Sequence, residues 1–348
     1  MNKHDYNIVP FEKKHLHKLA KLMKILWGKM EQEEIVQLLE WRYLQTPIQH
    51  IPHSFVLVKN DEVLAFRGWF ILKLTHCDQI FYTASLADAV VHPSERRKGW
   101  FEKMTKFSLG QIQKCKSVPF TTAISSNEKS IPGYLKIGYR VLFEINESYN
   151  IRPFSFLFTQ KAHFNKDQEI YTNNVLITEV PQLQIMEFLF EERIKNNRGA
   201  LQVKWDSGYL DWRFKRPDSK YVFSYLCNED ATIGFLIFKS WGNDRYSLVE
   251  FVADTSQDFY KMLHAFVKVM KPKIISCWEH ALKKQNINNR FFDGFYSIPK
   301  CFNFKKKSTS HPLLYMPNSN VENLSKSSES DLSDPKVWQI NELYSDSI

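Results

Sequence analysis

The sequence contains no uninterrupted apolar stretch of the roughly 18 to 20 residues that a membrane-spanning helix needs. Its first residues, MNKHDYNIVPFEKKHLHK, lack the apolar core of a secretory signal peptide. The cysteines number five, are widely spaced and form no CxxC pair, which argues against a disulfide framework and a structural zinc site. From these absences we expect a cytoplasmic protein that binds neither a membrane nor a metal.

The rest of the composition is typical of a soluble globular protein. The chain has 348 residues, 43% of them hydrophobic, which is enough for two domains with a core in each. Its formal net charge of +9 at pH 7 attracts phosphates in general. The clusters KPK (271–273) and KKK (305–307) lack interleaved aromatic residues, so we expect them to be solvated and expect no nucleic-acid partner.

The second half of the chain repeats the first. LEWRY (39–43) returns as LDWRF (210–214), and the same offset relates the VP pairs at 9–10 and 180–181. Later pairs keep the same order: SLADAVV (85–91) with SLVEFVA (247–253), and IGYR (137–140) with DGFY (293–296). Because the Trp-Arg pair recurs in both copies, we assign it to packing.

Hydrophobic periodicity predicts alternating strands and helices within the first copy. A strand at Val9 precedes helical spacing over 13–27, and residues 53–72 alternate like a hairpin that turns at Asn60 and Asp61. Further strands are expected at 81–91, 119–125 and 139–145, and helices at 100–116 and 131–136. This order predicts an α/β fold with a central mixed sheet in each copy.

Composition sets the expected domain boundaries. We expect a first domain over 1–150, a connector over 151–174 and a second domain over 175–317. The segment 318–348 is rich in Ser, Asn, Asp and Glu and is predicted to be a flexible tail. Within it, VWQINELY (337–344) is apolar enough to dock, with Trp338 and Leu343 as anchors.

The stretch HPSERRKGWF (92–101) places cations and one glycine between a predicted strand and a predicted helix. The start of a helix presents unpaired N–H groups and the positive end of the helix dipole. Gly99 permits a close approach to the backbone, while Arg96, Arg97 and Lys98 add positive charge. The stretch therefore suits a pyrophosphate.

These residues resemble the signature loop of the GNAT superfamily of N-acetyltransferases, in which a strand ending in V-x-P leads into R/Q-x-x-G-x-G/A. Val91 and Pro93 match the strand end, and Arg96 and Gly99 match the loop. Phe101 departs from the pattern, which has Gly or Ala there, and this implies a looser or shifted adenosine diphosphate. The resemblance implies that acetyl-coenzyme A is bound by Val90, Val91, Arg96, Arg97, Lys98, Gly99, Trp100 and Phe101.

A second block, SNEKSIPGYLKIGY (126–139), resembles the later GNAT signature N-x-x-(A/S)-x-x-x-Y-x-K-x-G-F. The match implies that Asn127 and Ser130 also contribute to cofactor binding, and Tyr134 becomes the candidate general acid. A phenol, with an ordinary pKa of about 10, is protonated at neutral pH and can give its proton to a leaving thiolate.

The acceptor amine has to lose a proton, to a base or through a water chain. Asp88 and His92 lie on the same face of the predicted strand as Val90, and we expect Asp88 to be the base. A structural Asp and a surface His are the alternatives. The resemblance also implies a bulge near Ala89 to Val91 whose N–H groups polarise the thioester carbonyl.

The second copy lacks the residues that this chemistry needs. Its counterpart of the loop, ADTSQD (253–258), is shorter and has two carboxylates but no cation or glycine, so it would repel a pyrophosphate. Arg290 stands where the first copy has Tyr134. We therefore expect a tandem GNAT-like fold whose second copy has lost the coenzyme A loop.

These patterns favour an N-acetyltransferase that moves an acetyl group from acetyl-coenzyme A to the amine of a small acceptor, such as an amino sugar or amino acid derivative. Two alternatives stay open. One is a non-catalytic sensor that binds acyl-coenzyme A, and the other is a transferase of the same fold with a different donor, such as an aminoacyl-tRNA or a long-chain acyl group. The sequence leaves the acceptor and the oligomeric state undetermined.

Overall fold

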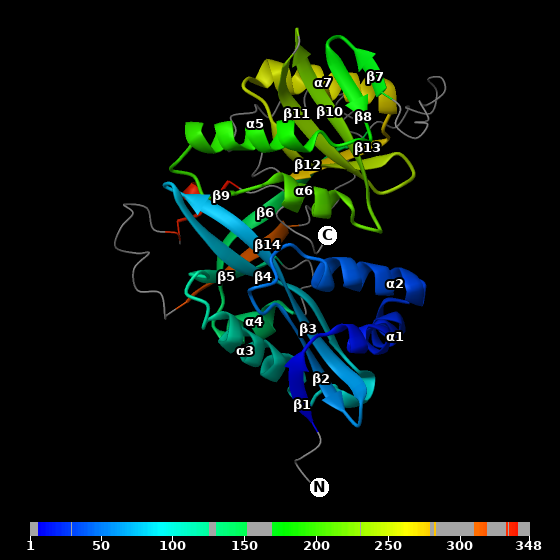
Figure 1. The fold of residues 1–348 in the computed structure, drawn as a ribbon, viewed down its shortest axis with the longest axis vertical. Helices are drawn as coiled ribbons and strands as arrows, with labels where there is room; N and C mark the ends of the chain where they lie inside the picture. The colour runs from blue at the N-terminus through cyan, green and yellow to red at the C-terminus, as the bar shows by residue number, and fades with distance from the viewer. Residues whose placement is uncertain are drawn as a thin grey trace, which may run out of the picture.

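The computed structural model describes residues 6–28, 30–124, 130–151, 169–229, 231–278, 282, 310–318, 332 and 334–339. Its strands form one 14-stranded sheet in the order β1-β2-β3-β4-β5-β14-β6-β13-β12-β11-β10-β8-β7, with β9 paired to β3. Figure 1 shows the two copies stacked end to end along the long axis of the molecule. None of the described helices is long and apolar enough to cross a membrane.

The first copy begins with short elements and then widens into the sheet. It comprises β1 (Asn7–Pro10), η1 (Lys13–His15), α1 (Leu16–Trp27), α2 (Gln32–Leu39), η2 (Glu40–Leu44), β2 (Ser54–Lys59), β3 (Glu62–His76), β4 (Gln79–Val91), η3 (Pro93–Glu95), α3 (Trp100–Ile112), β5 (Phe120–Ile124), α4 (Ile131–Ile137) and β6 (Arg140–Ile151). The predicted hairpin turn is confirmed: Asn60 and Asp61 have φ of 47° and 64°, which their short side chains tolerate.

The described part of the second copy follows a similar order, with an additional strand at its start and the short β9, which pairs with β3 of the first copy. It comprises β7 (Glu169–Thr172), β8 (Val175–Thr178), α5 (Leu183–Asn196), β9 (Gln202–Val203), α6 (Ser207–Phe214), β10 (Lys220–Asn228), β11 (Ala231–Ser240), β12 (Arg245–Val252), α7 (Ser256–Met270) and β13 (Ile274–Trp278). Its β12 and β13 pair in parallel, as β4 and β5 do in the first copy. The repeat in the sequence is thus a repeat in the fold.

Helices cover both faces of the sheet in the first copy. Ala65 packs with Met104 of α3, whereas its neighbour Phe66 packs with Leu19 of α1 and Leu39 of α2. Because successive side chains of a strand point to opposite faces, β3 contributes to two separate apolar layers. The largest apolar cluster contains residues of both copies, so one core runs through the molecule.

Strand β4 carries a bulge and then loses its neighbour. Arg67 lies opposite Ala89 and Trp69 opposite Leu86, so Ala87 and Asp88 together face the single residue Gly68. Pairing with β5 ends at Leu86, although β4 continues to Val91. One edge of residues 87–91 is therefore without a strand partner among the described residues, and Ala89 is exposed there.

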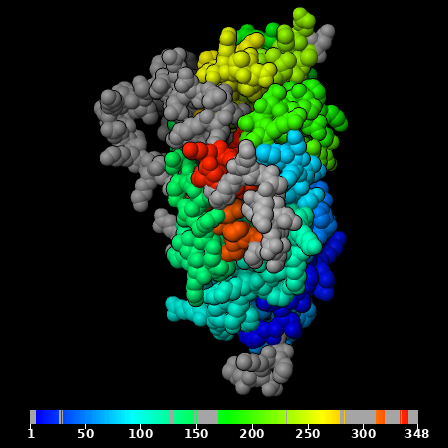
Figure 2. All heavy atoms as spheres, turned by 90° about the vertical axis from the view of Figure 1, so that its left-hand side faces the viewer, coloured from blue at the N-terminus to red at the C-terminus, as the bar shows by residue number. Residues whose placement is uncertain are grey.

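The last strand of the chain completes the sheet of the first copy. β14 (Ser310–Pro317) lies between β5 and β6 and is antiparallel to both, so the expected second domain of 175–317 does not hold for this segment. Strand β6 is longer than predicted because its second half pairs with β13 and joins the two copies. Figure 2 shows the described C-terminal residues, in orange and red, against the green and cyan of the first copy.

The expected docking of the tail is confirmed at Trp338. Its side chain is fully buried, packs against the rings of Phe120 and Tyr315, and donates from Nε1 to the Leu332 carbonyl at 3.0 Å. The neighbouring backbone exchanges hydrogen bonds with Leu201 of the second copy. The other predicted anchor, Leu343, lies outside the described residues.

The repeated tryptophans meet each other where the two copies join. Trp41 and Trp212, 171 positions apart, stack with ring centroids 4.7 Å apart and an interplanar angle of 11°. Trp41 Nε1 donates to the Trp212 carbonyl at 2.7 Å, and Trp212 Nε1 donates to the Trp41 carbonyl at 2.9 Å. The contact is self-complementary, as in a two-fold interface between identical subunits, and it confirms a packing role for the two tryptophans of the repeated Trp-Arg pair.

We expect this reciprocal contact to be energetically coupled. Trp41→Ala or Trp212→Ala should each lower the free energy of unfolding by about 3 to 5 kcal/mol, because each removes a buried ring and a hydrogen bond. The double variant should lower the free energy of unfolding by less than the sum of the two single variants, since each single change already breaks the shared contact. The difference, which is the coupling energy, should be about 1 to 3 kcal/mol. Guanidinium denaturation measures all three.

The matched control is Trp241→Ala, because Trp241 is 45% exposed. It should cost no more than about 1 kcal/mol. Additive costs for Trp41 and Trp212, or costs as small as that of the control, would contradict a shared contact between the copies.

Candidate active site

The loop before α3 leaves backbone N–H groups free to bind an anion. Gly99 is the N-cap of α3 with φ of 79° and ψ of 11°, a conformation that favours glycine, and no side chain caps the helix. The first amide that donates within the helix is that of Lys103, to the Gly99 carbonyl at 3.1 Å. The N–H groups of Trp100, Phe101 and Glu102 consequently have no partner inside the helix.

Two of the three predicted cations of this loop are available for a ligand. Arg96 and Arg97 are exposed, and neither pairs with a carboxylate in the part of the chain that the structure describes. Arg97 has φ of 64°, so the chain turns sharply just before the helix. The loop thus offers two guanidinium groups beside the free amides, which is the arrangement expected for a phosphate site.

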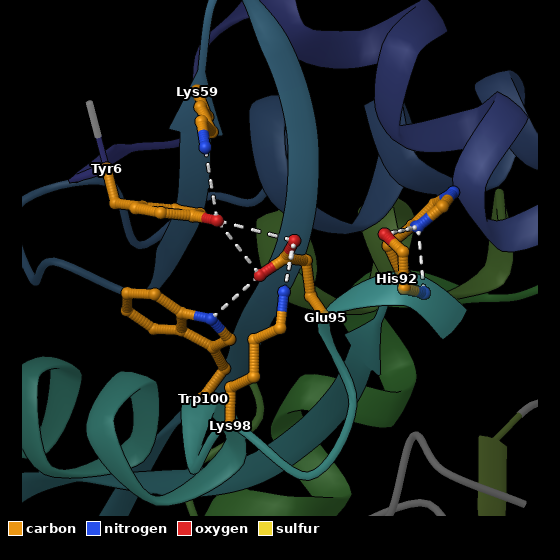
Figure 3. Close-up of polar contacts among 7 residues, drawn as sticks. Tyr6, Lys59, His92, Glu95, Lys98 and Trp100 are labelled. Carbon is orange, nitrogen blue, oxygen red and sulfur yellow. Dashed lines mark hydrogen bonds and ion pairs between the residues drawn. The ribbon is translucent and has the colours of Figure 1, made fainter. Parts of the chain in front are cut away.

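Lys98 and Trp100 point to an internal carboxylate instead. Glu95 is buried, and its carboxylate accepts from Lys98 Nζ at 2.9 Å, Trp100 Nε1 at 3.2 Å and Tyr6 OH at 3.3 Å. Figure 3 shows these three side chains converging on Glu95, with Lys59 donating to Tyr6 OH. The side chains of Lys98 and Trp100, which the resemblance assigns to cofactor binding, are therefore used to brace the loop.

The same carboxylate has a perturbed pKa. Burial acts to raise the pKa of Glu95, but the hydrogen bonds from Lys98 and Trp100 outweigh it, and the pKa lies below its ordinary value of 4.5. The hydrogen bond to Glu95 in turn raises the pKa of Lys98. At neutral pH, the pair is fully ionised and holds the turn of η3 against the start of α3.

The corresponding helix of the second copy is capped by its own residues. Thr255 is the N-cap of α7, and its Oγ1 accepts from the Asp258 amide at 3.1 Å. Both helices have an acid in the first turn, Asp258 in α7 and Glu102 in α3, and Glu102 is paired with Lys106 and Lys136. Because the Thr255 side chain already caps this helix start, it offers no anion site comparable to that of α3. In the second copy, the segment that corresponds to the predicted coenzyme A loop thus ends in a capped helix start.

Tyr134 of α4 lies on the α3 side of the sheet. It is 5% exposed, and its hydroxyl oxygen lies 3.5 Å from Nη1 of Arg67. Its ring packs against those of Phe101 and Tyr139, with centroids 5.5 and 6.0 Å away. The structure thus brings Tyr134 next to Phe101, the first turn of the helix whose amides are free.

Phe101, which stands where the GNAT pattern has Gly or Ala, places its side chain against α4. A Cβ added to Gly133 of α4 would lie 2.8 Å from the Phe101 ring, so α3 and α4 pack together through this aromatic contact. The Phe101 side chain therefore lies between the two helices, whereas its backbone N–H belongs to the free helix start.

Asp88 lies on the opposite face of the sheet from Tyr134. Its Oδ2 accepts from Arg42 Nη1 at 2.6 Å and from Tyr43 OH at 2.8 Å. A Cβ on Gly68 would lie 2.1 Å from the Tyr43 hydroxyl, so only glycine lets that hydroxyl reach Asp88. The predicted base is thus an ion-paired carboxylate that fixes η2, and the structure does not bring it together with Tyr134.

The other predicted residues have mixed placements. His92 caps η3, because its Nδ1 accepts from the Ser94 amide at 3.2 Å, as Figure 3 shows. Val90 packs with the α1 and α2 layer and Val91 with Trp100. Ser130 is the N-cap of α4, whereas Asn127 lies outside the described residues. The bulge expected near Ala89 to Val91 occurs directly before it, at Ala87 and Asp88.

The structure adds three residues that the motifs miss. Glu95 stands inside the basic loop, Tyr43 ends the repeated LEWRY segment, and Arg67 interrupts the apolar run AFRGWF (65–70). A single charge within a predicted buried strand is the one signal among these that could have been recognised, because such charges are rare unless paired. The roles of Glu95 and Tyr43 depend on contacts over long distances in sequence.

A separate cavity lies where the two copies meet. Its volume is about 460 Å³, and it is lined by Gln37, Glu40, Trp41, Gln45, Asp211, Trp212, Lys215 and Pro217. The charged lining residues Glu40, Asp211 and Lys215 carry a net negative charge, which is unfavourable for a phosphate-bearing donor. None of the lining residues belongs to the loop before α3.

Comparison with known proteins establishes the fold. The sequence matches no family model and no curated protein. A GCN5-related N-acetyltransferase from Kribbella flavida is similar in structure, with a TM-score of 0.58, 14% identity, and coverage of 90% of this chain and 72% of the other. One from Anabaena variabilis has a TM-score of 0.57, 11% identity, and coverage of 90% and 73%.

An N-myristoyltransferase is also similar in structure, at a lower sequence identity. N-myristoyltransferase from Saccharomyces cerevisiae, solved with bound myristoyl-CoA, has a TM-score of 0.58 and 10% identity, and the match covers 91% of this chain and 84% of the other. At such low identities the likeness is one of fold. The chain has the GNAT fold in tandem, as the sequence predicts.

The bracing role of Glu95 predicts a pH-dependent contribution to stability. Glu95→Gln should lower the free energy of unfolding by about 1 to 2 kcal/mol at pH 7, because it removes the charge that Lys98 and Trp100 bind. A carboxyl group with a lowered folded pKa stabilises above its unfolded value of 4.5 and ceases to do so as the pH falls through the folded pKa. The difference between wild type and variant should therefore shrink below pH 4.5.

Urea denaturation between pH 7 and pH 3 measures this difference. The control is Glu192→Gln, which breaks the exposed ion pair with Lys195 at the same spacing and should cost less than about 0.5 kcal/mol. A Glu95→Gln cost that stays constant with pH would mean that ionisation of Glu95 does not brace the loop.

Proposed function

We propose that the protein is an N-acyltransferase that takes its acyl group from acyl-coenzyme A. The finer proposal is acetyl-coenzyme A as the donor and the amine of a small molecule, such as an amino sugar or amino acid derivative, as the acceptor. The uncapped start of α3, with two exposed arginines beside it, is the observation that carries the proposal. The fold, shared with N-acetyltransferases and N-myristoyltransferase, supports the reaction class.

The donor's pyrophosphate would be bound by the loop before α3. Its oxygens would accept hydrogen bonds from the N–H groups of Gly99, Trp100 and Phe101, while Arg96 and Arg97 supply charge. The pantetheine arm would then follow the unpaired edge of β4 at residues 87–91, toward the bulge. Asn127 and Ser130 stay in the proposal as further contacts of the cofactor.

The transfer itself would use Tyr134 as the general acid. The amine nitrogen attacks the thioester carbon, the C–S bond breaks, and sulfur takes the electron pair together with the Tyr134 hydroxyl proton. Backbone groups at the exposed Ala89 would polarise the carbonyl. The proton that the amine loses passes to solvent, because Asp88 is already bound by Arg42 and Tyr43.

The names of the similar structures cover both acetyl and myristoyl donors, so the first experiment compares the two chain lengths. Acetyl-CoA and myristoyl-CoA are each mixed with a panel of amino sugars and amino acids, and free thiol is measured over time. Turnover with acetyl-CoA supports the finer proposal, and turnover with myristoyl-CoA alone replaces the donor. Tight coenzyme A binding in calorimetry without turnover on any amine supports the non-catalytic sensor instead.

Tyr134→Phe tests the general acid. We expect kcat to fall by about 100-fold or more, while the Kd for coenzyme A changes by less than about three-fold, because the hydroxyl acts on the leaving group only. Thiol-release assays measure kcat, and calorimetry measures the Kd for coenzyme A.

The matched control is Tyr139→Phe, because the rings of Tyr139 and Tyr134 are neighbours, with centroids 6.0 Å apart. Its hydroxyl is hydrogen-bonded to Thr121 Oγ1 at 2.8 Å, and burial raises the pKa of Tyr139, so it should leave kcat unchanged. Full activity of Tyr134→Phe would overturn the role of Tyr134 as the acid.

A further inference from the structure

An arginine without a carboxylate partner is buried beside Tyr134. Arg67 of β3 is 1% exposed. Its Nε and Nη2 donate to Thr105 Oγ1 at 3.1 and 2.9 Å, and its Nη1 donates to the Tyr134 hydroxyl at 3.5 Å. Within the described ranges of the chain, no Asp or Glu pairs with it.

This isolation is costly, and two other arginines, the buried Arg42 and the largely buried Arg193, do have a carboxylate partner. Arg42 pairs with Asp88 at 2.6 Å, and Arg193 pairs with Glu250 at 3.0 Å. Arg67 has two aromatic faces instead, with its guanidinium carbon 5.0 Å from the Phe101 ring centroid and 5.4 Å from that of Tyr134. A buried charge without a counter-ion destabilises a fold, so its presence here calls for a role other than stability.

The hydrogen bond from Arg67 fixes the direction of the Tyr134 proton. A guanidinium group has only donors, so the tyrosine oxygen must accept, and its own proton points elsewhere. That proton meets no acceptor among the residues that the structure describes. Tyr139 differs, because its hydroxyl is shared with Thr121. Tyr134 therefore has a proton that no described acceptor holds.

Arg67 also lies under the part of β4 where the thioester is proposed to bind. It is directly opposite Ala89 across the β3–β4 pair, and residues opposite each other share a face of the sheet. Ala89 is exposed and belongs to the edge that β5 leaves unpaired. The guanidinium, the phenol and the open strand edge thus lie on one side of the sheet.

We infer that Arg67 is a positioning residue for acyl transfer: it directs the Tyr134 hydroxyl proton toward the thioester sulfur and stabilises the phenolate that remains. The inference rests on the proposed function. When the C–S bond breaks, sulfur takes the bond's electron pair and the Tyr134 proton, and the negative charge passes to the phenol oxygen beside Arg67 Nη1. The phenolate is neutralised when the proton lost by the amine nitrogen reaches it through solvent.

The test separates charge from stability with Arg67→Met and Arg67→Lys. Arg67→Met should lower kcat by about 100-fold or more, as the loss of a preorganised donor does elsewhere, with KM for the acyl donor changed by less than about three-fold. Its Tm should equal or exceed that of the wild type, since an unpaired buried charge is removed. Arg67→Lys keeps the charge and should retain at least about a tenth of the wild-type kcat.

Arg193→Met is the matched control, because it removes a largely buried arginine that does have a carboxylate partner. It should lower the Tm and leave kcat per folded molecule unchanged. The inference is overturned if Arg67→Met lowers the Tm with kcat intact, or if Arg67→Lys is as inactive as Arg67→Met. If the wild type itself turns over no acyl donor, the proposed function fails first, and the inference fails with it.

Discussion

The free amides at the start of α3 are the interaction on which the rest of the site depends. A helix start leaves N–H groups unpaired, and proteins usually satisfy them with a capping side chain. In α7 of the second copy, Thr255 does so. In α3 the N-cap is Gly99, which has no side chain, and the loop before it adds Arg96 and Arg97. The helix start is thus capped by a side chain in α7, whereas in α3 its N–H groups are left without such a cap.

The remainder of the first copy holds this helix start next to the edge of β4 that β5 leaves unpaired. The bulge at Ala87 and Asp88 bends β4, and β5 ends its pairing at Leu86, so the edge leading to α3 is left open. On the far side, Asp88 ties the bulge to η2 through Arg42 and Tyr43. The second copy contributes through the stacked tryptophans and through β14, which returns from the end of the chain to complete the sheet of the first copy.

Much of this fold could be predicted from the sequence, because it depends on local patterns. The hairpin at Asn60 and Asp61, the strand that becomes β4 and the helix at Trp100 all follow from periodicity and turn residues. The repeat predicted two copies, and the shared tryptophans predicted a packing role. The position of β14 could not be predicted, since an alternating apolar segment shows that a strand forms without showing which edge it joins.

The site was predictable to the extent that it depends on the backbone. Gly99 and its neighbours are where the motif puts them, and Tyr134 lies against Phe101. The roles of the side chains were harder to predict, because a motif does not show which other residues bind them. Glu95 accepts hydrogen bonds from Lys98 and Trp100, and Asp88 is ion-paired with Arg42. Arg67, whose partner Tyr134 is 67 positions away, belongs to no motif at all.

The central claim is that the amides before and at the start of α3 bind the phosphates of the donor. Amide hydrogen exchange with and without coenzyme A tests it most directly, since it follows those N–H groups themselves. The account predicts slower exchange for the segment 97–102 when coenzyme A is added, no change for 255–259 of the second copy, and loss of the effect in Gly99→Asp. Protection of 255–259 instead, or binding of coenzyme A that leaves 97–102 unprotected, would contradict it.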